Sequence, residues 1–235
     1  MDNFDRFFPQ IKFFGEDLNE KIINTKVLIV GIGGLGSWLA EIFARWGIKR
    51  IGILDYDKVE ISNLTRQNYL EEDLGKKKIE SLEKRINKIN SAIKVNKYEK
   101  ISLEYFKNYD IFFDCVDNIE TKYLLNEISV YLNKPYIFGT VVGEVGFFGY
   151  IDPKDFCFYD IFKGKKDFLT NKQIGIEISS VMFLSSLMAK LFTKTLLDKK
   201  SRVFHFNLSD FRIEEIKINR KECKICIKKE FEYLK

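Results

Sequence analysis

The sequence predicts an α/β fold: a Rossmann-like, mostly parallel sheet with helices on both faces, closed by C-terminal antiparallel strands. Three observations indicate this class: an apolar run that enters a glycine-rich turn, short apolar runs that alternate with helical periodicity, and a β-rich final third. The 235 residues include 46% hydrophobic side chains, enough for a core of substantial size. We expect a single domain over residues 1–235, because no linker or internal repeat interrupts the pattern.

The first predicted strand, residues 27–30, runs directly into a glycine-rich turn. Gly31 can supply the tight bend, and Gly33 or Gly34 leaves the backbone open to a phosphate. Gly36 allows the following helix to pack closely on the strand. Phosphates bound at this turn would lie at a helix N-terminus, where unpaired N–H groups and the helix dipole favour negative charge.

Helical and strand periods alternate through the rest of the first half. Apolar residues at intervals of three and four mark the helices, Gly47 and Gly75 mark a helix end and a helix entry, and residues 59–73 show no clear period. The predicted elements are a helix over 37–47, a strand over 51–54, a helix over 76–90, a strand around 93–98 and a short segment at 103–106.

A buried central strand is predicted over residues 109–116, and Asp117 and Asn118 follow at its carboxyl end. Ligands bind at that edge of open parallel sheets, so Asp117 is a candidate on topology alone. Cys115 and His205, the only histidine, are expected to be packing residues. The remaining elements are a helix over 121–133, a strand over 135–139, a glycine-punctuated strand or hairpin over 143–151, a long helix near 176–198 and a hairpin of 202–208 with 211–218.

Composition narrows the compartment and the partners. The net charge of +5 is spread along the chain, which argues against a nucleic-acid partner. No apolar N-terminal segment with a basic flank occurs, and the uncharged stretch 178–189 is shorter than the roughly 20 residues of a membrane span. We therefore expect a cytoplasmic protein without a membrane partner. In that compartment, four cysteines argue against a disulfide framework and leave metal binding open.

Asp55 ends the second predicted strand, about 20 positions after Gly36, where a carboxylate can hold a ribose hydroxyl. NAD and ATP both carry that ribose. A set of cationic and amide donors follows, which suits a triphosphate better than a dinucleotide. The donors of this set are Asn63, Arg66, Gln67 and Lys78, and the carboxylate of Asp57 precedes them.

These residues form one combined pattern: G-x-G-G-x-G, D-x-D-x-V-x-x-x-N-x-x-R-Q, a lysine at a helix entry, and C-x-D-N. The pattern resembles the adenylating domain of the ubiquitin-activating enzymes and their bacterial relatives, the ThiF/MoeB/HesA family. It runs from about Arg6 to Cys226, and is most similar in appearance to the sulfur-carrier-protein adenylyltransferases of thiamine and molybdopterin biosynthesis.

The resemblance implies an ATP- and Mg²⁺-dependent reaction, in which a carboxylate attacks the α-phosphorus of ATP and gives an acyl-adenylate and pyrophosphate. It implies that Asp55 holds the ribose and that Asp117 binds magnesium. Arg6, at the family's N-terminal arginine position, would reach into the ATP site of a partner subunit, which implies a homodimer. Catalytic roles fall to Arg6, Arg66, Lys78 and Asp117, and the nucleotide would contact Gly31, Gly33, Gly34, Gly36, Asp55, Asp57, Asn63, Arg66, Gln67, Lys78, Asp117 and Asn118.

The sequence departs from the family at a zinc site that many relatives build from two C-x-x-C pairs. The second pair is intact as Cys223 and Cys226, whereas Asp160 stands in the fourth place of the first pair, after Cys157. Zinc accepts carboxylate oxygen, so both a structural site of three cysteines with one aspartate and a lost site stay open.

A second departure concerns residues 171–175, where some relatives carry a cysteine that takes the activated carrier; none occurs here. The resemblance implies a partner that is a small ubiquitin-like sulfur carrier ending in Gly-Gly, of the thiamine or molybdopterin type, and the missing cysteine favours a separate sulfur donor. The alternatives are an adenylating relative that acts on a peptide or on a carboxylate linked to transfer RNA, a non-catalytic partner subunit, and an NAD-binding oxidoreductase.

Overall fold

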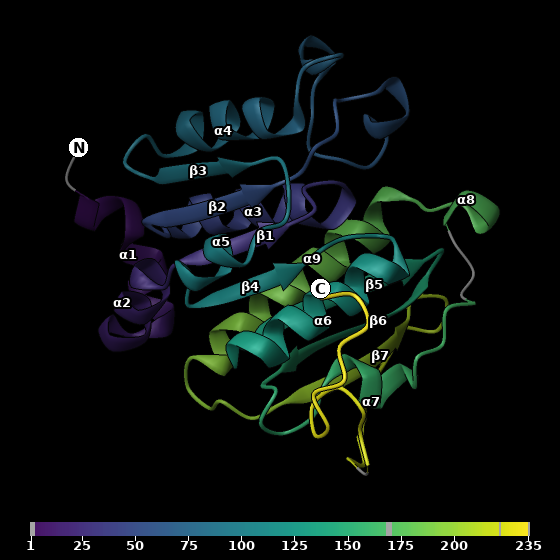
Figure 1. Ribbon diagram of the computed structural model, residues 1–235. Coiled ribbons are helices and arrows are strands. Elements are labelled where there is room, and N and C mark those ends of the chain that lie inside the picture. Colours follow the sequence, from purple (N-terminus) through teal and green to yellow (C-terminus); the bar gives the residue numbers. More distant parts are fainter. Residues whose placement is uncertain (1–2, 168–170, 221, 235) are drawn as a thin grey trace.

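A computed structural model describes residues 3–167, 171–220 and 222–234 and confirms the α/β class. Its eight-stranded sheet has the order β3-β2-β1-β4-β5-β6-β7-β8 (Figure 1). The pairings from β3 to β5 are parallel and those from β5 to β8 are antiparallel. The strands are β1 (Val27–Val30), β2 (Arg50–Leu54), β3 (Lys94–Tyr98), β4 (Ile111–Asp114), β5 (Tyr136–Val142), β6 (Val145–Ile151), β7 (Arg202–Asn207) and β8 (Arg212–Ile216).

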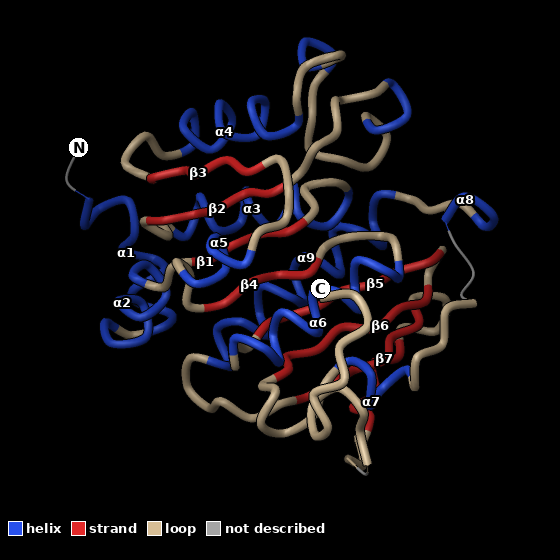
Figure 2. Tube along the Cα trace, viewed as in Figure 1, coloured by secondary structure: helices blue, strands red, loops and turns tan. Residues whose placement is uncertain are grey.

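Helices cover both faces of this sheet (Figure 2). Alternate residues of β1 separate two cores: Val27 and Ile29 pack with α3, α4 and α9, while Leu28 and Val30 pack with α5, α6 and α7. The helices are α1 (Asn3–Phe14), α2 (Glu16–Asn24), α3 (Gly34–Trp46), α4 (Lys78–Ile89), α5 (Leu103–Lys107), α6 (Ile119–Leu132), α7 (Phe158–Phe162), α8 (Asn171–Ile174) and α9 (Ile178–Thr195), with short 3₁₀ turns at Ile61–Asn63 and Glu71–Asp73. None of the described helices is long and apolar enough to cross a membrane.

Strand register places three polar chain segments at one edge. Val30 at the end of β1 pairs with Leu54 at the end of β2 and with Asp114 at the end of β4. The residues that follow these ends therefore leave the sheet together, on the side of α8, whereas α1 and α2 lie beside the amino ends of the strands (Figure 1).

Some expected elements change length, and four helices, α1, α2, α7 and α8, were not predicted. The central strand ends at Asp114, not at residue 116, although Cys115 beyond it is still buried. His205 packs its ring 4.9 Å from that of Phe147, as expected of a packing residue. Helices α1 and α2 are both amphipathic, so the helical period of residues 3–24 was a signal that could have predicted them.

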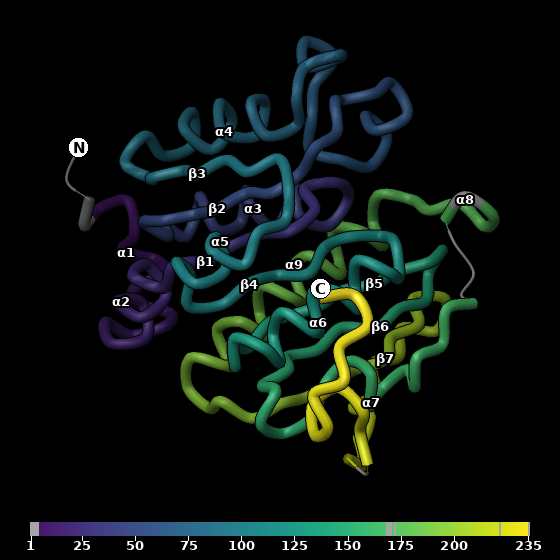
Figure 3. Tube along the Cα trace, viewed as in Figure 1, coloured from purple at the N-terminus to yellow at the C-terminus, as the bar shows by residue number. Residues whose placement is uncertain are grey.

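The C-terminal segment returns to α6 after the last strand (Figure 3). Glu127 of α6 is buried, and its carboxylate accepts the backbone N–H groups of Glu232, Tyr233 and Leu234 at 2.7–2.8 Å. The Tyr233 ring stacks on that of Tyr123 at 6.0 Å. One buried side chain thus fixes three consecutive backbone groups of this segment.

Candidate active site

The glycine loop joins β1 to α3 in a conformation that depends on two of its glycines. Gly31 has φ +82°, and its N–H donates to the Leu54 carbonyl at 2.9 Å. A Cβ on Gly36 would lie 2.0 Å from the Gly31 carbonyl oxygen, so α3 packs on the loop with no space for a side chain. Gly33 is the N-cap of α3 and forms no side-chain cap, which leaves the first N–H groups of the helix for another acceptor.

Asp55 braces this loop from the end of β2. One carboxylate oxygen accepts the Ile32 N–H at 2.9 Å and the other accepts the Asp57 N–H at 2.9 Å. Each oxygen retains a lone pair, and the side chain is partly exposed. Asp55 can therefore accept a ligand hydroxyl while its own orientation is fixed.

Residues 67–69 lie over the loop. Gln67 is buried, and a Cβ on Gly33 would lie 3.6 Å from its amide nitrogen. Its side-chain oxygen has no hydrogen-bond partner in the described part of the chain. The Tyr69 hydroxyl donates to the Ile32 carbonyl at 2.7 Å, and burial, reinforced by the charge of Asp55, raises the pKa of Tyr69 well above its usual value. A buried amide oxygen without a partner, beside the loop, suits a polar ligand.

Two cations approach the same edge from different segments. Lys78 begins α4, its side chain is 6% exposed, and its ammonium lies 2.9 Å from the half-exposed Asp57 carboxylate. Arg66 is partly exposed, and its guanidinium donates to the Ser62 carbonyl at 2.8 Å. The Asp57 carboxylate thus holds Lys78 in place and balances its charge.

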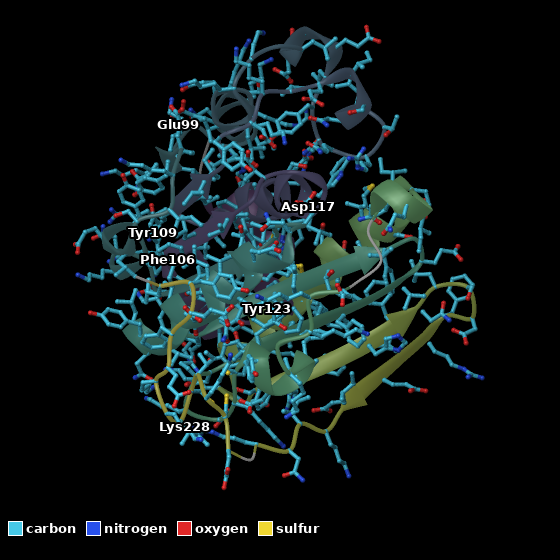
Figure 4. All side chains as sticks on the ribbon, turned by 45° about the vertical axis from the view of Figure 1, so that its right-hand side comes forward. Glu99, Phe106, Tyr109, Asp117, Tyr123 and Lys228 are labelled. Atoms are coloured by element: carbon cyan, nitrogen blue, oxygen red, sulfur yellow. The ribbon has the colours of Figure 1, made fainter. Side chains whose placement is uncertain are left out.

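Three other predicted residues differ in whether their side chains already form hydrogen bonds within the chain. Asn63 is buried and accepts the Glu60 N–H at 3.1 Å, so its amide closes a local turn. Asn118 is the N-cap of α6 and accepts the Thr121 N–H at 2.8 Å. Asp117 is exposed, and its carboxylate forms no hydrogen bond or ion pair with any described residue. Figure 4 shows Asp117 near the loop that joins β1 to α3.

Arg6 lies away from these residues within its own chain. Its guanidinium donates to the Ile89 carbonyl at the last residue of α4, whereas Lys78 is the first residue of that helix. The structure therefore gathers the other predicted residues at one edge and leaves Arg6 at the far end of α4.

The four predicted metal ligands come together in a buried cluster. The side-chain ligand atoms of Cys157, Asp160, Cys223 and Cys226 all lie within 4.8 Å of one another. The sulfurs of Cys157 and Cys223 are 3.6 Å apart, close to the separation of about 3.8 Å that tetrahedral ligands at a Zn–S distance of 2.3 Å would have. The hydrogen bond between these two sulfurs lowers the pKa of Cys223 and raises the pKa of Cys157, so the two thiols share one proton between them. The residues fit a zinc ion.

Sequence reasoning missed four residues that hold this edge or the C-terminal segment in place. Tyr69 and Glu127 carry no pattern of their own, because their partners are backbone groups distant in the sequence. Asp114 carries a signal that was available: a carboxylate inside the apolar run Ile111-Phe112-Phe113 is buried with it and needs a cation. That cation is Lys122.

A family model described as the ThiF family matches residues 7–226. The chain belongs to the ThiF family. Adenylyltransferase and sulfurtransferase MOCS3 of Dictyostelium discoideum is 34% identical over 224 residues, which are 87% of this chain and 52% of that protein. Sulfur carrier protein adenylyltransferase of Thermus thermophilus is 35% identical over 149 residues, 60% of this chain and 54% of that protein.

This ThiF-family chain also matches solved structures. E. coli MccB crystallised with ATP superposes with a TM-score of 0.79 and 24% identity, covering 96% of this chain and 74% of that one. MccB in complex with N-formylated MccA gives a TM-score of 0.81. At these identities the likeness shows the fold. Because the chain spans about half the length of the two curated relatives named above, their whole activity does not transfer directly.

Proposed function

We propose that this ThiF-family chain is an ATP-dependent adenylyltransferase that activates the C-terminal Gly-Gly carboxylate of a small ubiquitin-like sulfur carrier protein. The observation that carries the proposal is one sheet edge at which four groups meet: a glycine loop, the carboxylate of Asp55, the buried side-chain oxygen of Gln67, which has no partner among the described residues, and Lys78 paired with Asp57. The curated relatives named as adenylyltransferases support the same reaction class.

Each group at this edge has a task in adenylation. The open N-terminus of α3 at Gly33 would take phosphate oxygens, and Asp55 would accept a ribose hydroxyl. Arg66 and Lys78 would neutralise the charge that moves onto pyrophosphate as the carboxylate attacks the α-phosphorus. No general base is required, because the attacking carboxylate is already ionised.

Asp117 is the proposed magnesium ligand. Magnesium prefers carboxylate oxygen, and this carboxylate is exposed, lies at the carboxyl end of β4 and has no competing partner among the described residues. When bound, magnesium would supply charge neutralisation at the phosphates. Asp117 would hold it, while Asn118 keeps the start of α6 in place.

The carrier is proposed to leave as the adenylate, with sulfur supplied by a separate donor. All four cysteines are buried: three belong to the cluster, and burial raises the pKa of Cys115, which makes that thiol a poor nucleophile. This arrangement favours the molybdopterin-type mode over a thiol-bearing thiamine-type mode. Both carrier types remain candidates for recognition.

The test is pyrophosphate exchange into ATP with purified carriers of both types. Exchange should depend on the carrier, and mass spectrometry should detect AMP on its C-terminal glycine. A carrier that lacks the final glycine is the matched control and should give no adduct. Exchange that does not depend on any carrier would contradict the proposal, and exchange driven by a free peptide would favour a peptide acceptor instead.

A further inference from the structure

The turn that carries Asp117 rests on a buried ion pair that the proposed chemistry does not use. Lys122 of α6 and Asp114 of β4 have side chains 4% and 0% exposed, and their charged atoms lie 3.0 Å apart. Among the ion pairs of the described residues, only this one has both side chains buried.

The pair ties three elements to the turn. The Lys122 ammonium also donates to the Gly139 carbonyl of β5 at 3.0 Å, and the bonded Asp114 oxygen accepts the Val116 N–H at 3.2 Å. A Cβ on Gly31 would meet the backbone of Cys115 and the side chain of Val116 at 3.0 Å, so the turn also packs on the glycine loop. The Asp117 side chain forms no hydrogen bond or ion pair with a described residue, so the orientation of its carboxylate depends on these neighbours.

Stability alone is a weak reason for such a pair. Burying two charges costs free energy, and well-packed apolar replacements of a buried pair are often neutral or stabilising. The second oxygen of Asp114 is buried without a partner in the described structure, which adds to the cost. What the pair does provide is a fixed geometry at the residues immediately before Asp117.

We propose that Asp114 and Lys122 are positioning residues that aim the Asp117 carboxylate at the cation of cation-bound ATP. This inference rests on the proposed function, because it takes Asp117 as the metal ligand. It predicts that loss of the pair weakens cation binding through Asp117 and leaves the fold in place.

The experiment measures Mn²⁺ binding in the presence of ATP by water-proton relaxation, with urea unfolding to verify each variant. The double variant Asp114→Leu, Lys122→Met removes both charges and should weaken Mn²⁺ binding about tenfold, the scale of lost outer-shell support. Lys122→Arg, which keeps the charge and the donors, should stay within about threefold. Lys107→Met breaks an exposed ion pair and is the control expected to match wild type.

A double-mutant cycle with Asp117→Asn distinguishes a positioning role from a purely structural one. Adding the double change to Asp117→Asn should cause little further loss, because the pair acts through Asp117. Two outcomes would overturn this inference and leave the proposed function standing. One is that the losses of Mn²⁺ binding from the double change and from Asp117→Asn add in full, and the other is wild-type Mn²⁺ binding in a folded double variant. A wild-type chain that binds no Mn²⁺ with ATP would overturn the proposed function and this inference together. If the double variant does not fold, Lys122→Gln compared with Lys122→Arg gives the same decision.

Discussion

At the scale of single residues, Gly33 and Gly36 stand three positions apart and carry different constraints. The space beside Gly33 is open, with the Gln67 amide at ordinary contact distance. The space beside Gly36 is filled by the Gly31 carbonyl. A side chain at Gly33 would therefore restrict the approach of a ligand, whereas a side chain at Gly36 would disrupt the packing of α3 on the loop.

We expect Gly36→Ala to cost about 3 kcal/mol or more of the free energy of unfolding, and Gly33→Ala to cost clearly less, because only the space beside Gly36 is filled. Gly33→Ala should nevertheless weaken ATP binding, because its methyl group occupies the surface offered to phosphate. Urea unfolding and ATP titration calorimetry measure the two effects. Equal stability losses in the two variants would contradict this separation.

At the scale of elements, α9 begins with a charged cap. The Glu177 carboxylate accepts the N–H groups of Ser179 and Ser180 at 2.7 and 2.6 Å. The hydrogen bonds from Ser179, followed by those from Ser180, lower the pKa of Glu177 to about 2. The folded state therefore favours the ionised carboxylate.

Since the folded pKa lies below the unfolded value, the stabilisation from Glu177 is present above about pH 4.5 and is lost as the pH falls toward 2. Glu177→Ala should lower the free energy of unfolding at pH 7 by about 1 kcal/mol, the usual contribution of a cap. The difference from wild type should shrink in acid. Denaturant unfolding at pH 7 and pH 3 checks this, and a constant difference would show that the carboxylate charge is not responsible.

The metal cluster links α7 to the segment after β8. We expect the purified chain to contain about one zinc per molecule, because three cysteines and a carboxylate complete a tetrahedral donor set. Cys223→Ser should lose that zinc and lower the melting temperature, whereas Cys115→Ala should keep it, since Cys115 lies outside the cluster. Atomic emission measures the metal, and an equal zinc content in both variants would exclude the cluster as the site.

At the scale of the whole molecule, Arg6 and Lys78 lie at opposite ends of α4. If Arg6 serves the site of a partner subunit, Arg6→Ala and Lys78→Ala chains should each be inactive alone. Mixed in equal amounts, they should recover about a quarter of wild-type activity, because half of the dimers are mixed and each mixed dimer has one intact site. Pyrophosphate exchange after subunit mixing checks this, and recovery of no activity would argue against a shared site.

The sequence anticipated the parts of this molecule that depend on local order. The loop glycines, Asp55 and Asp117 each follow a strand, and parallel strand register then brings them together. The parts it did not anticipate depend on partners chosen by tertiary packing. Nothing local says that Tyr69 bonds to Ile32, or that Glu127 receives residues more than a hundred positions later.

The same distance has a consequence for the order of synthesis. Cys157 and Asp160 emerge from the ribosome with α7, but Cys223 lies 66 residues after Cys157, beyond all eight strands. During that interval the nascent chain holds one thiol and one carboxylate of the cluster, half of a metal site. The cluster and the hydrogen bonds to Glu127 can form only once the segment after β8 has been translated. All eight strands have by then been synthesised, so these contacts can form on a completed sheet.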